Sequence, residues 1–173
     1  MEPKLEITYK PEKKDYVKAS RTLAMKTKMF LILAIVLAVG IVASTVILLL
    51  PSLQESYARN IAIVVLWVGV FYVLYFFALI PLQLNRAYKK NEFMQMPRKF
   101  AFTDDKLKMS IADKSTELEW EHLRKVVFND GLYLMVYKKD SPVYPFIHER
   151  AFADETEREA FLNLLKDKSI PIE

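Results

Sequence analysis

Two stretches decide the fold of this chain. Residues 29–50 read MFLILAIVLAVGIVASTVILLL, and residues 61–84 read IAIVVLWVGVFYVLYFFALIPLQL, without a charged residue or a histidine in either. As helices they would reach roughly 33 and 36 Å, more than the roughly 30 Å hydrocarbon core of a bilayer. Neither shows the polar spacing of a surface helix, and the remaining chain is too short to cover both on all sides. The sequence therefore predicts two transmembrane helices.

The charges outside these stretches predict the orientation. The chain of 173 residues has 25 Lys and Arg and 21 Asp and Glu, a net charge of +4. Residues 1–28 hold 8 basic and 4 acidic side chains, whereas residues 85–173 hold 16 of each. Basic residues concentrate in the cytoplasmic flanks of membrane helices. We therefore expect a two-span protein of the inner or plasma membrane, with both termini in the cytoplasm.

The flanks of the spans support this arrangement. Residues 51–60 would form a short outer loop, in which Ser52 and Glu55 are spaced as a helix-capping pair. The polar leader and the apolar run after it are too long for a cleaved signal peptide. Basic residues next to the spans are expected to contact anionic headgroups, at about 1 kcal/mol each close to the surface. These residues are Lys26, Lys28, Arg86, Lys89 and Lys90.

Small residues within the spans predict close helix packing. Ala34 and Ala38, and separately Gly40 and Ser44, have small-x-x-x-small spacing, and Gly69 is a small residue in the second span. Packing of the two spans within one chain is the simpler interpretation, and a homo-oligomeric interface is the alternative. The spans contain no Asp, Glu, Lys, Arg or His, which argues against a transporter or pump.

Beyond the second span the hydrophobic period changes to two, which is typical of strands. Asn129-Asp130-Gly131 is the sharpest hairpin signal, because Gly supplies positive φ. Asp154 and Glu157 form a capping pair that opens a helix over about 155–168. Short strands are expected near residues 99–102, 106–111, 117–120, 126–128, 132–137 and 143–147, the last an edge or bulge because of Pro145.

These elements predict a fold class. The chain is expected to be a membrane α+β protein, with a two-helix transmembrane hairpin and a small antiparallel β-barrel or sheet domain at 85–173. A C-terminal helix would close that domain on the plan of a pleckstrin-homology-like barrel. Residues 5–9 also alternate, and this strand could pair with a sheet edge, so that the spans would be an insertion into one split domain. Both span helices are expected to continue into their cytoplasmic flanks without a break.

Four segments of the chain are similar to those of a known protein family. They are LEITYKPEKKDYVKAS at 5–20, KFAFTDDKLKMS at 99–110, TELEWEHLRKVVFNDGLYLMVYKK at 116–139 and FIHERAFADETEREAFLNLLKDK at 146–168. Together with the two spans, they resemble the YcxB-like family of bacterial membrane proteins. The most specific points are the step from Leu118 to Trp120, the Asp130-Gly131 hairpin and the lead Arg150-Ala151-Phe152. Where the family usually has a Pro-Lys pair, this chain has His148-Glu149. The resemblance implies a pleckstrin-homology-like cytoplasmic fold and no established catalytic residues.

The composition excludes several kinds of chemistry. The chain has no Cys, which excludes a disulfide scaffold, a thiol nucleophile and Cys-ligated zinc. It has only 3 Gly, too few for a Gly-rich phosphate loop, and its two histidines, His122 and His148, lack paired ligand spacing. We therefore expect no catalytic set, no metal site and no cofactor. Nucleic-acid binding is also not expected, because the positive charge lies in the leader and not on the C-terminal domain.

Three functions remain open at this stage. The first is a membrane-anchored binding module, whose domain would recognise a protein partner or an inner-leaflet lipid through a sheet edge or the basic flanks. The second is an immunity protein that protects the cell from a toxin or bacteriocin at the membrane. The third is an accessory subunit of a larger membrane complex, with the spans as the interface.

Overall fold

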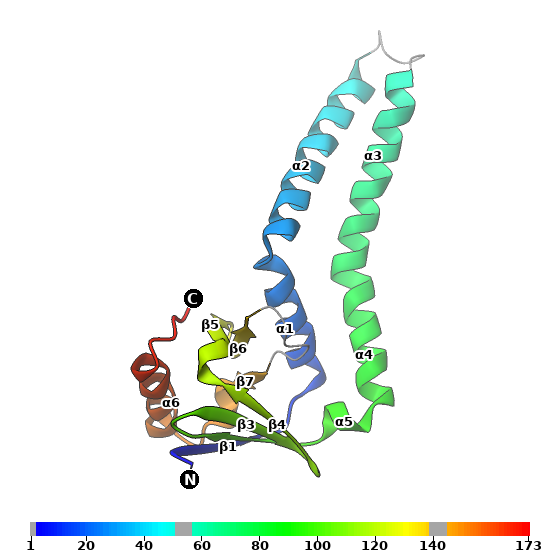
Figure 1. The fold of residues 1–173 in the computed structure, drawn as a ribbon. Helices are drawn as coiled ribbons and strands as arrows, with labels where there is room; N and C mark the ends of the chain where they lie inside the picture. Colours follow the sequence, from blue (N-terminus) through cyan, green and yellow to red (C-terminus); the bar gives the residue numbers. More distant parts are fainter. Residues whose placement is uncertain (1–2, 51–56, 139–144) are drawn as a thin grey trace. The chain divides into compact units, whose positions relative to one another are not determined.

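The structure is a computed structural model that describes residues 3–50, 57–138 and 145–173, without the side chain of Met29 (Figure 1). The chain divides into two compact units. Met1–Thr22 and Ala87–Glu173 form the first, which we call the sheet unit, and Leu23–Arg86 form the second, the helix unit. The predicted capping pair Ser52 and Glu55 and the turn at 139–142 lie outside the described residues, as do the first two residues of the predicted strand 143–147.

The helix unit is an antiparallel pair (Figure 1). One arm is α2 (Lys28–Leu49), and the other is α3 (Tyr57–Leu74), which continues through a π-helical turn, η2 (Tyr75–Leu79), into α4 (Ile80–Lys90). Both arms are long and apolar enough to span a membrane. The expected continuation of the second helix beyond Leu84 is confirmed.

The π-helical turn lies just before Pro81. Proline has no N–H to donate to the carbonyl four residues earlier, and its ring crowds that carbonyl. Here the N–H of Ile80 bonds the carbonyl of Tyr75, five residues back, which widens the helix before the proline. The irregularity is absorbed without ending the helix, as is common for π-bulges.

The first helix is interrupted, which corrects the expectation of an unbroken helix into the first span. A separate helix, α1, spans Lys13–Met25, and α2 begins at Lys28. Thr27 lies between them with extended backbone angles (φ −80°, ψ 131°), and its hydroxyl accepts a hydrogen bond from the N–H of Phe30 at 3.3 Å. The same hydroxyl donates to the carbonyl of Ala24 at 2.7 Å. One Thr side chain thus closes the first helix and caps the second.

The sheet unit contains two antiparallel sheets. The first has the order β1 (Leu5–Tyr9), β2 (Arg98–Phe102), β3 (Lys106–Ile111) and β4 (Lys114–Glu119). The second has the order β5 (Leu123–Asn129), β6 (Leu132–Tyr137) and β7 (Phe146–His148). Short helical turns α5 (Glu92–Gln95), η3 (Trp120–His122) and η4 (Glu149–Ala151) lie between strands, and α6 (Glu155–Asp167) follows them.

The N-terminal strand completes the first sheet. β1 pairs with β2 along its whole length, from Leu5 opposite Phe102 to Tyr9 opposite Arg98. The pairing suggested by the alternation at 5–9 is therefore present. Ile7 and Tyr9 are buried, so β1 also contributes to the core. The helix unit is inserted between β1 and β2 in the chain order.

The core lies between the two sheets and α6. Phe161 of α6 packs against Phe102 of the first sheet and Tyr133 of the second, with ring centroids 5.4 Å apart in both cases. Asp154 caps α6 by accepting a hydrogen bond from the N–H of Glu157 at 2.8 Å, as the spacing predicts. The Asp130-Gly131 hairpin is confirmed, with positive φ at both residues (51° and 76°).

The expectation of a barrel is corrected, because the two sheets do not close on each other. The turn η3 separates β4 from β5. The outer edge of β5 is then occupied by the C-terminal tail. Val126 donates to the carbonyl of Pro171 at 2.9 Å, and Glu173 donates to the carbonyl of Val126 at 3.0 Å. A hydrogen-bonded ladder between β4 and β5 would need the same backbone groups of β5 that already bond to the tail.

Candidate functional site

The small residues of the helix unit lie at a regular seam. The buried or half-buried positions include 30, 34, 37, 41, 44 and 48 of α2, and 58, 62, 65, 69 and 72 of α3 with 76 of η2. This alternation of three and four residues is the spacing of coiled-coil-like packing between two helices.

Gly40, Ser44 and Gly69 take part in this contact. A Cβ added to Gly40 would lie 3.1 Å from Cγ1 of Val65, and one added to Gly69 would lie 2.8 Å from Cδ1 of Ile41. Ser44 is buried. This supports the interpretation that these residues serve packing within one chain.

The two residues of the other predicted pair, Ala34 and Ala38, differ in exposure. Ala34 is half-buried, but Ala38 is exposed, because the seam passes from position 34 to position 37. The predicted headgroup-contact residues Lys26, Lys28, Arg86, Lys89 and Lys90 are all exposed. Their contact with lipid stays a prediction.

A buried ionic cluster joins α1, β1 and η4 in the sheet unit. Asp15 is fully buried and accepts hydrogen bonds from the Tyr9 hydroxyl, the Glu12 N–H (2.6 Å) and the Arg150 guanidinium. Burial alone would raise the pKa of Asp15, but these hydrogen bonds outweigh it and hold the pKa below its usual range. Burial, and then the hydrogen bond to Asp15, raise the pKa of the Tyr9 hydroxyl. The cluster holds the sheet unit together.

The sequence reasoning missed this cluster. Arg150 is named only as part of a motif, and Asp15 only counts towards the charge of the leader. The available signal is an acidic residue in the first turn after Pro11, where a helix N-terminus favours negative charge. Nothing in the sequence indicates that its partner lies 135 residues away.

A second buried cation stabilises the same region. Arg98 is 8% exposed, and its guanidinium lies 5.2 Å from the ring centroids of both Tyr16 and Phe146. It donates to the Tyr16 hydroxyl, which in turn donates to the carbonyl of Met94 at 2.8 Å. Burial raises the pKa of Tyr16. These contacts tie α1 to β2, β7 and α5.

The feature best placed to bind another molecule is the outer edge of β4. β4 is the last strand of its sheet, and its side chains are exposed except that of Leu118, which is half-buried. No strand among the described residues pairs with this edge. It differs in this respect from β5, whose outer edge is covered by the tail.

The hairpin geometry shows which backbone groups point outward. β3 and β4 are joined by two residues, and Ile111 lies opposite Lys114, so hydrogen-bonded pairs recur at every second residue from Lys114. The N–H of Trp120 donates to the carbonyl of Asp105 at 3.5 Å, which continues this even-numbered series. The N–H and C=O groups of the odd-numbered residues, Ser115, Glu117 and Glu119, therefore face outward.

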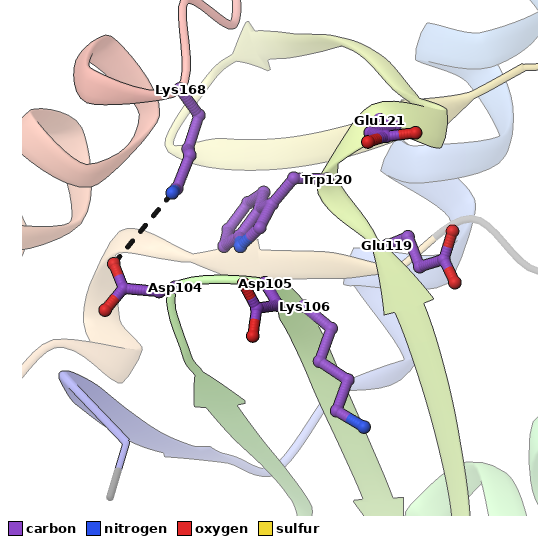
Figure 2. Close-up of a pocket in the computed structure, with 7 residues that line it drawn as sticks. All are labelled: Asp104, Asp105, Lys106, Glu119, Trp120, Glu121 and Lys168. Carbon is purple, nitrogen blue, oxygen red and sulfur yellow. Dashed lines mark ion pairs between the residues drawn. The ribbon is translucent and has the colours of Figure 1, made fainter. Parts of the chain in front are cut away.

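A shallow pocket of about 670 Å³ lies at the end of β4 (Figure 2). Trp120, which is 7% exposed, forms its wall, and the indole N–H donates to the carbonyl of Thr103 at 2.9 Å. Figure 2 shows charged side chains around this indole, drawn from the β2–β3 turn, β3, the end of β4, η3 and the residue after α6. The lining residues are Asp104, Asp105, Lys106, Glu119, Trp120, Glu121 and Lys168.

The pocket is acidic. Its four carboxylates and two ammonium groups leave a formal charge of −2. Asp104 is paired with Lys4 at 2.6 Å, and the hydrogen bond from Lys4 lowers the pKa of Asp104. Asp105 and Glu121 have no ion pair within the described part of the chain. Glu119 lies 3.5 Å from His122 and opposite Lys106 in the β3–β4 register. The pocket therefore offers three carboxylates to a cation.

The described residues show no arrangement suited to a metal. Across residues 3–50, 57–138 and 145–173, no three His, Asp or Glu side chains come together in a way that could hold a metal ion. The pocket carboxylates are spread around the indole of Trp120 (Figure 2). The arrangement is suited to contacts with a larger cationic group.

Comparison of the chain with protein-family models, with curated proteins and with solved structures found no match. The similarity to the YcxB-like family remains a prediction from the sequence motifs. The functional conclusion therefore depends on the geometry of the two units.

Proposed function

We propose that this chain is a non-enzymatic, membrane-anchored binding module, in which the sheet unit binds a segment of a partner protein at the outer edge of β4. The observation that carries the proposal is the open edge of β4, where three successive outward-facing residues have backbone groups without a strand partner in the described part of the chain. Peptides bind such edges by adding a strand, with main-chain hydrogen bonds for affinity and side-chain pockets for specificity. The pocket beside Trp120 lies where such specificity is needed.

The membrane anchor is supported by the surface of the helix unit. In their most apolar 18-residue windows, only 6% of the first helix and 11% of the second are buried, which favours membrane helices over the mostly buried core helices of a soluble protein. Large apolar side chains such as Ile35, Val39 and Phe71 are about 60% exposed or more. Lipid would remove this surface from water, at roughly 25 cal/mol per Å² of apolar area.

The proposed orientation places the sheet unit in the cytoplasm. Lys26 precedes the first helix of the pair, and the second helix ends at Lys89 and Lys90. Residues 51–60, between the two spans, have Arg59 as their only basic residue. The positive-inside rule then puts both termini in the cytoplasm. Because Gly40, Ser44 and Gly69 are used within the chain, they do not favour the alternative of an accessory subunit.

Orientation can be tested with single cysteines, because the chain has none of its own. We expect Tyr57→Cys, at a residue that is 89% exposed, to react with a membrane-impermeant maleimide on intact cells. Asp113→Cys, in the exposed β3–β4 turn, should react only after permeabilisation. The opposite labelling would place the sheet unit outside and overturn the cytoplasmic assignment.

Binding can be tested by photo-crosslinking in living cells. A photoreactive amino acid at Ser115, on the open edge, should form discrete adducts with a partner protein. The same amino acid at Lys99, exposed on the inner strand β2, is the matched control and should form none. Equal adducts from both positions, or none from Ser115, would contradict binding at this edge.

A further inference from the structure

The charges around β4 indicate which kind of segment fits its edge. On the solvent face of the first sheet, the charged side chains are acidic on β1, basic on β2 and β3, and acidic on β4. Lys99 of β2 pairs with Glu6 of β1 at 2.7 Å, and Lys106 of β3 pairs with Glu117 of β4. Opposite charges on neighbouring strands stabilise a sheet, and like charges destabilise it. Beside the acidic strand β4, an added strand is therefore stabilised if it is basic.

We propose that the edge of β4 takes a basic extended segment of a partner protein, with Arg or Lys at alternate positions, and that one of these side chains enters the pocket beside Trp120. This inference rests on the proposed function and gives it a partner chemistry. Glu119 belongs both to the edge and to the pocket, so a strand that pairs with β4 leads a basic side chain to Glu121 and Asp105.

The register determines which residues of the segment are basic. Ser115, Glu117 and Glu119 face outward with their backbone groups, so the residues opposite them form the hydrogen-bonded pairs of an added antiparallel strand. Side chains of directly opposite residues lie on the same face of a sheet. In the added strand, the residues opposite Glu117 and Glu119 are therefore the basic residues. Their backbone N–H groups also form the hydrogen bonds to β4.

The side chains of the segment between its basic residues lie on the opposite face of the sheet. Thr116 and the half-buried Leu118 lie on that face, opposite the buried Met109 and Leu107 of β3. Apolar β-branched residues pack well against such neighbours. The segment should therefore alternate Arg or Lys with Val, Ile or Thr.

A second copy of the chain is a poorer occupant of this edge. In antiparallel pairing centred on Glu117, two Glu117 side chains would lie directly opposite each other, which is destabilising. Charged side chains on an edge strand are a common means of preventing such self-pairing. The same carboxylates that oppose a second copy favour a basic strand.

The test uses the full chain in nanodiscs of neutral phosphatidylcholine, so that a basic peptide has no anionic lipid to bind. The probe is a short fluorescent peptide that alternates arginine with valine, and the readout is fluorescence anisotropy. N-methylation of the arginine amides should weaken binding on the order of tenfold or more, because it removes the hydrogen bonds to β4. N-methylation of the valine amides is the matched control and should leave affinity within about twofold, because these amides point away from β4.

The carboxylates are tested on the protein side. The combined variant Asp105→Asn, Glu119→Gln and Glu121→Gln should weaken binding on the order of tenfold. Glu159→Gln, at an exposed carboxylate on α6, is the charge control and should leave affinity unchanged. Since all four are exposed or pocket-lining polar residues, the variants should fold normally, which amide hydrogen exchange of β2 can verify.

The outcomes separate this inference from the proposed function. Equal effects of the two methylations, or no effect of the triple variant, would mean nonspecific attraction and overturn the basic-strand inference. A glutamate-valine peptide that binds more tightly than the arginine peptide would overturn it as well. In each case, adducts from Ser115 and none from Lys99 in cells would keep the proposed function intact. Failure of both experiments would remove both.

Discussion

At the residue scale, the buried Asp15 is the side chain on which the sheet unit depends most. We expect Asp15→Asn to lower the free energy of unfolding by roughly 1.5–3 kcal/mol, because the hydrogen bonds that Asp15 accepts from Tyr9, Glu12 and Arg150 lose their charged acceptor. Amide hydrogen exchange of β2 in the full chain would measure this loss. Asp113→Asn, at an exposed turn residue, is the matched control and should change stability little.

The same carboxyl makes stability depend on pH. The folded pKa of Asp15 lies below its unfolded value of 3.8, so its contribution is fully present above that pH. It is lost as the pH falls from about 4 through the folded pKa. The variant Asp15→Asn should therefore have a flatter stability profile below pH 4. A parallel decline in the variant and the original chain would contradict this role.

Two buried tyrosines should respond differently to loss of the hydroxyl. Tyr9→Phe removes a hydrogen bond to a charged group and should cost about 1.5–3 kcal/mol. The hydroxyl of Tyr137 is buried and has no hydrogen-bond partner among the described residues, and burial raises its pKa. Tyr137→Phe should therefore be neutral or stabilising, within about 1 kcal/mol, because it removes an unsatisfied polar group. Thermal unfolding of both variants side by side would check the contrast, and equal destabilisation would refute it.

At the scale of elements, the seam between α2 and α3 explains why only some small residues matter. Gly69→Leu should destabilise the helix pair by about 1–3 kcal/mol, because even its Cβ would lie 2.8 Å from Cδ1 of Ile41. Ala38→Leu should be tolerated, since Ala38 is exposed. Loss of helical ellipticity during titration with a denaturing detergent would report on both variants.

A double variant is the control for the prediction at Gly69. Ile41→Ala removes the side chain that Gly69→Leu would meet, so the double variant should recover part of the lost stability. If the destabilisation of the double variant equals the sum of the two single effects, the contact between positions 41 and 69 is not the cause. Equal sensitivity of positions 38 and 69 would show that the seam has been assigned to the wrong face.

Elements with strong local patterns could be predicted from sequence, and those set by distant contacts could not. Alternation located β3, the Asn129-Asp130-Gly131 hairpin located β6, and the Asp154 cap located α6, because side chains within a few residues determine these features. The break at Thr27 was missed because the apolar run masks a capping residue at its start. The tail that covers β5 was missed because its residues 170–173 are too few to show a period.

The same distinction applies to the candidate site. A sheet edge could be named as a binding surface, but not which one, because the choice depends on where η3 and the tail stop the sheets from closing. The pocket gathers side chains from three separate stretches of the chain, 104–106, 119–121 and 168. No spacing within a single sequence reveals such a gathering.

At the scale of the whole molecule, the central feature is that the helix unit interrupts the sheet unit. β1 and β2 are neighbours in the sheet, yet the entire helix pair lies between them in the sequence. Hydrogen bonds near the two connections hold their ends within the sheet unit: Asn129 donates to the Thr22 hydroxyl at 2.9 Å, and the Tyr88 hydroxyl donates to the carbonyl of Pro11 at 3.1 Å. The sheet unit therefore has its own supports at both connections.

This organisation predicts that the helix pair can be removed and the N-terminal segment cannot. A chain that joins residues 1–22 to residues 87–173 through a flexible linker should fold as a soluble domain, since lengthening a loop costs little free energy. Residues 87–173 alone should not fold stably. They lose Ile7 and Tyr9 from the core, worth roughly 1.5–3 kcal/mol each, and they leave the edge of β2 unpaired. Dispersed amide signals in a two-dimensional NMR spectrum of the joined chain, against collapsed signals for 87–173, would confirm the split unit, and equal spectra would contradict it.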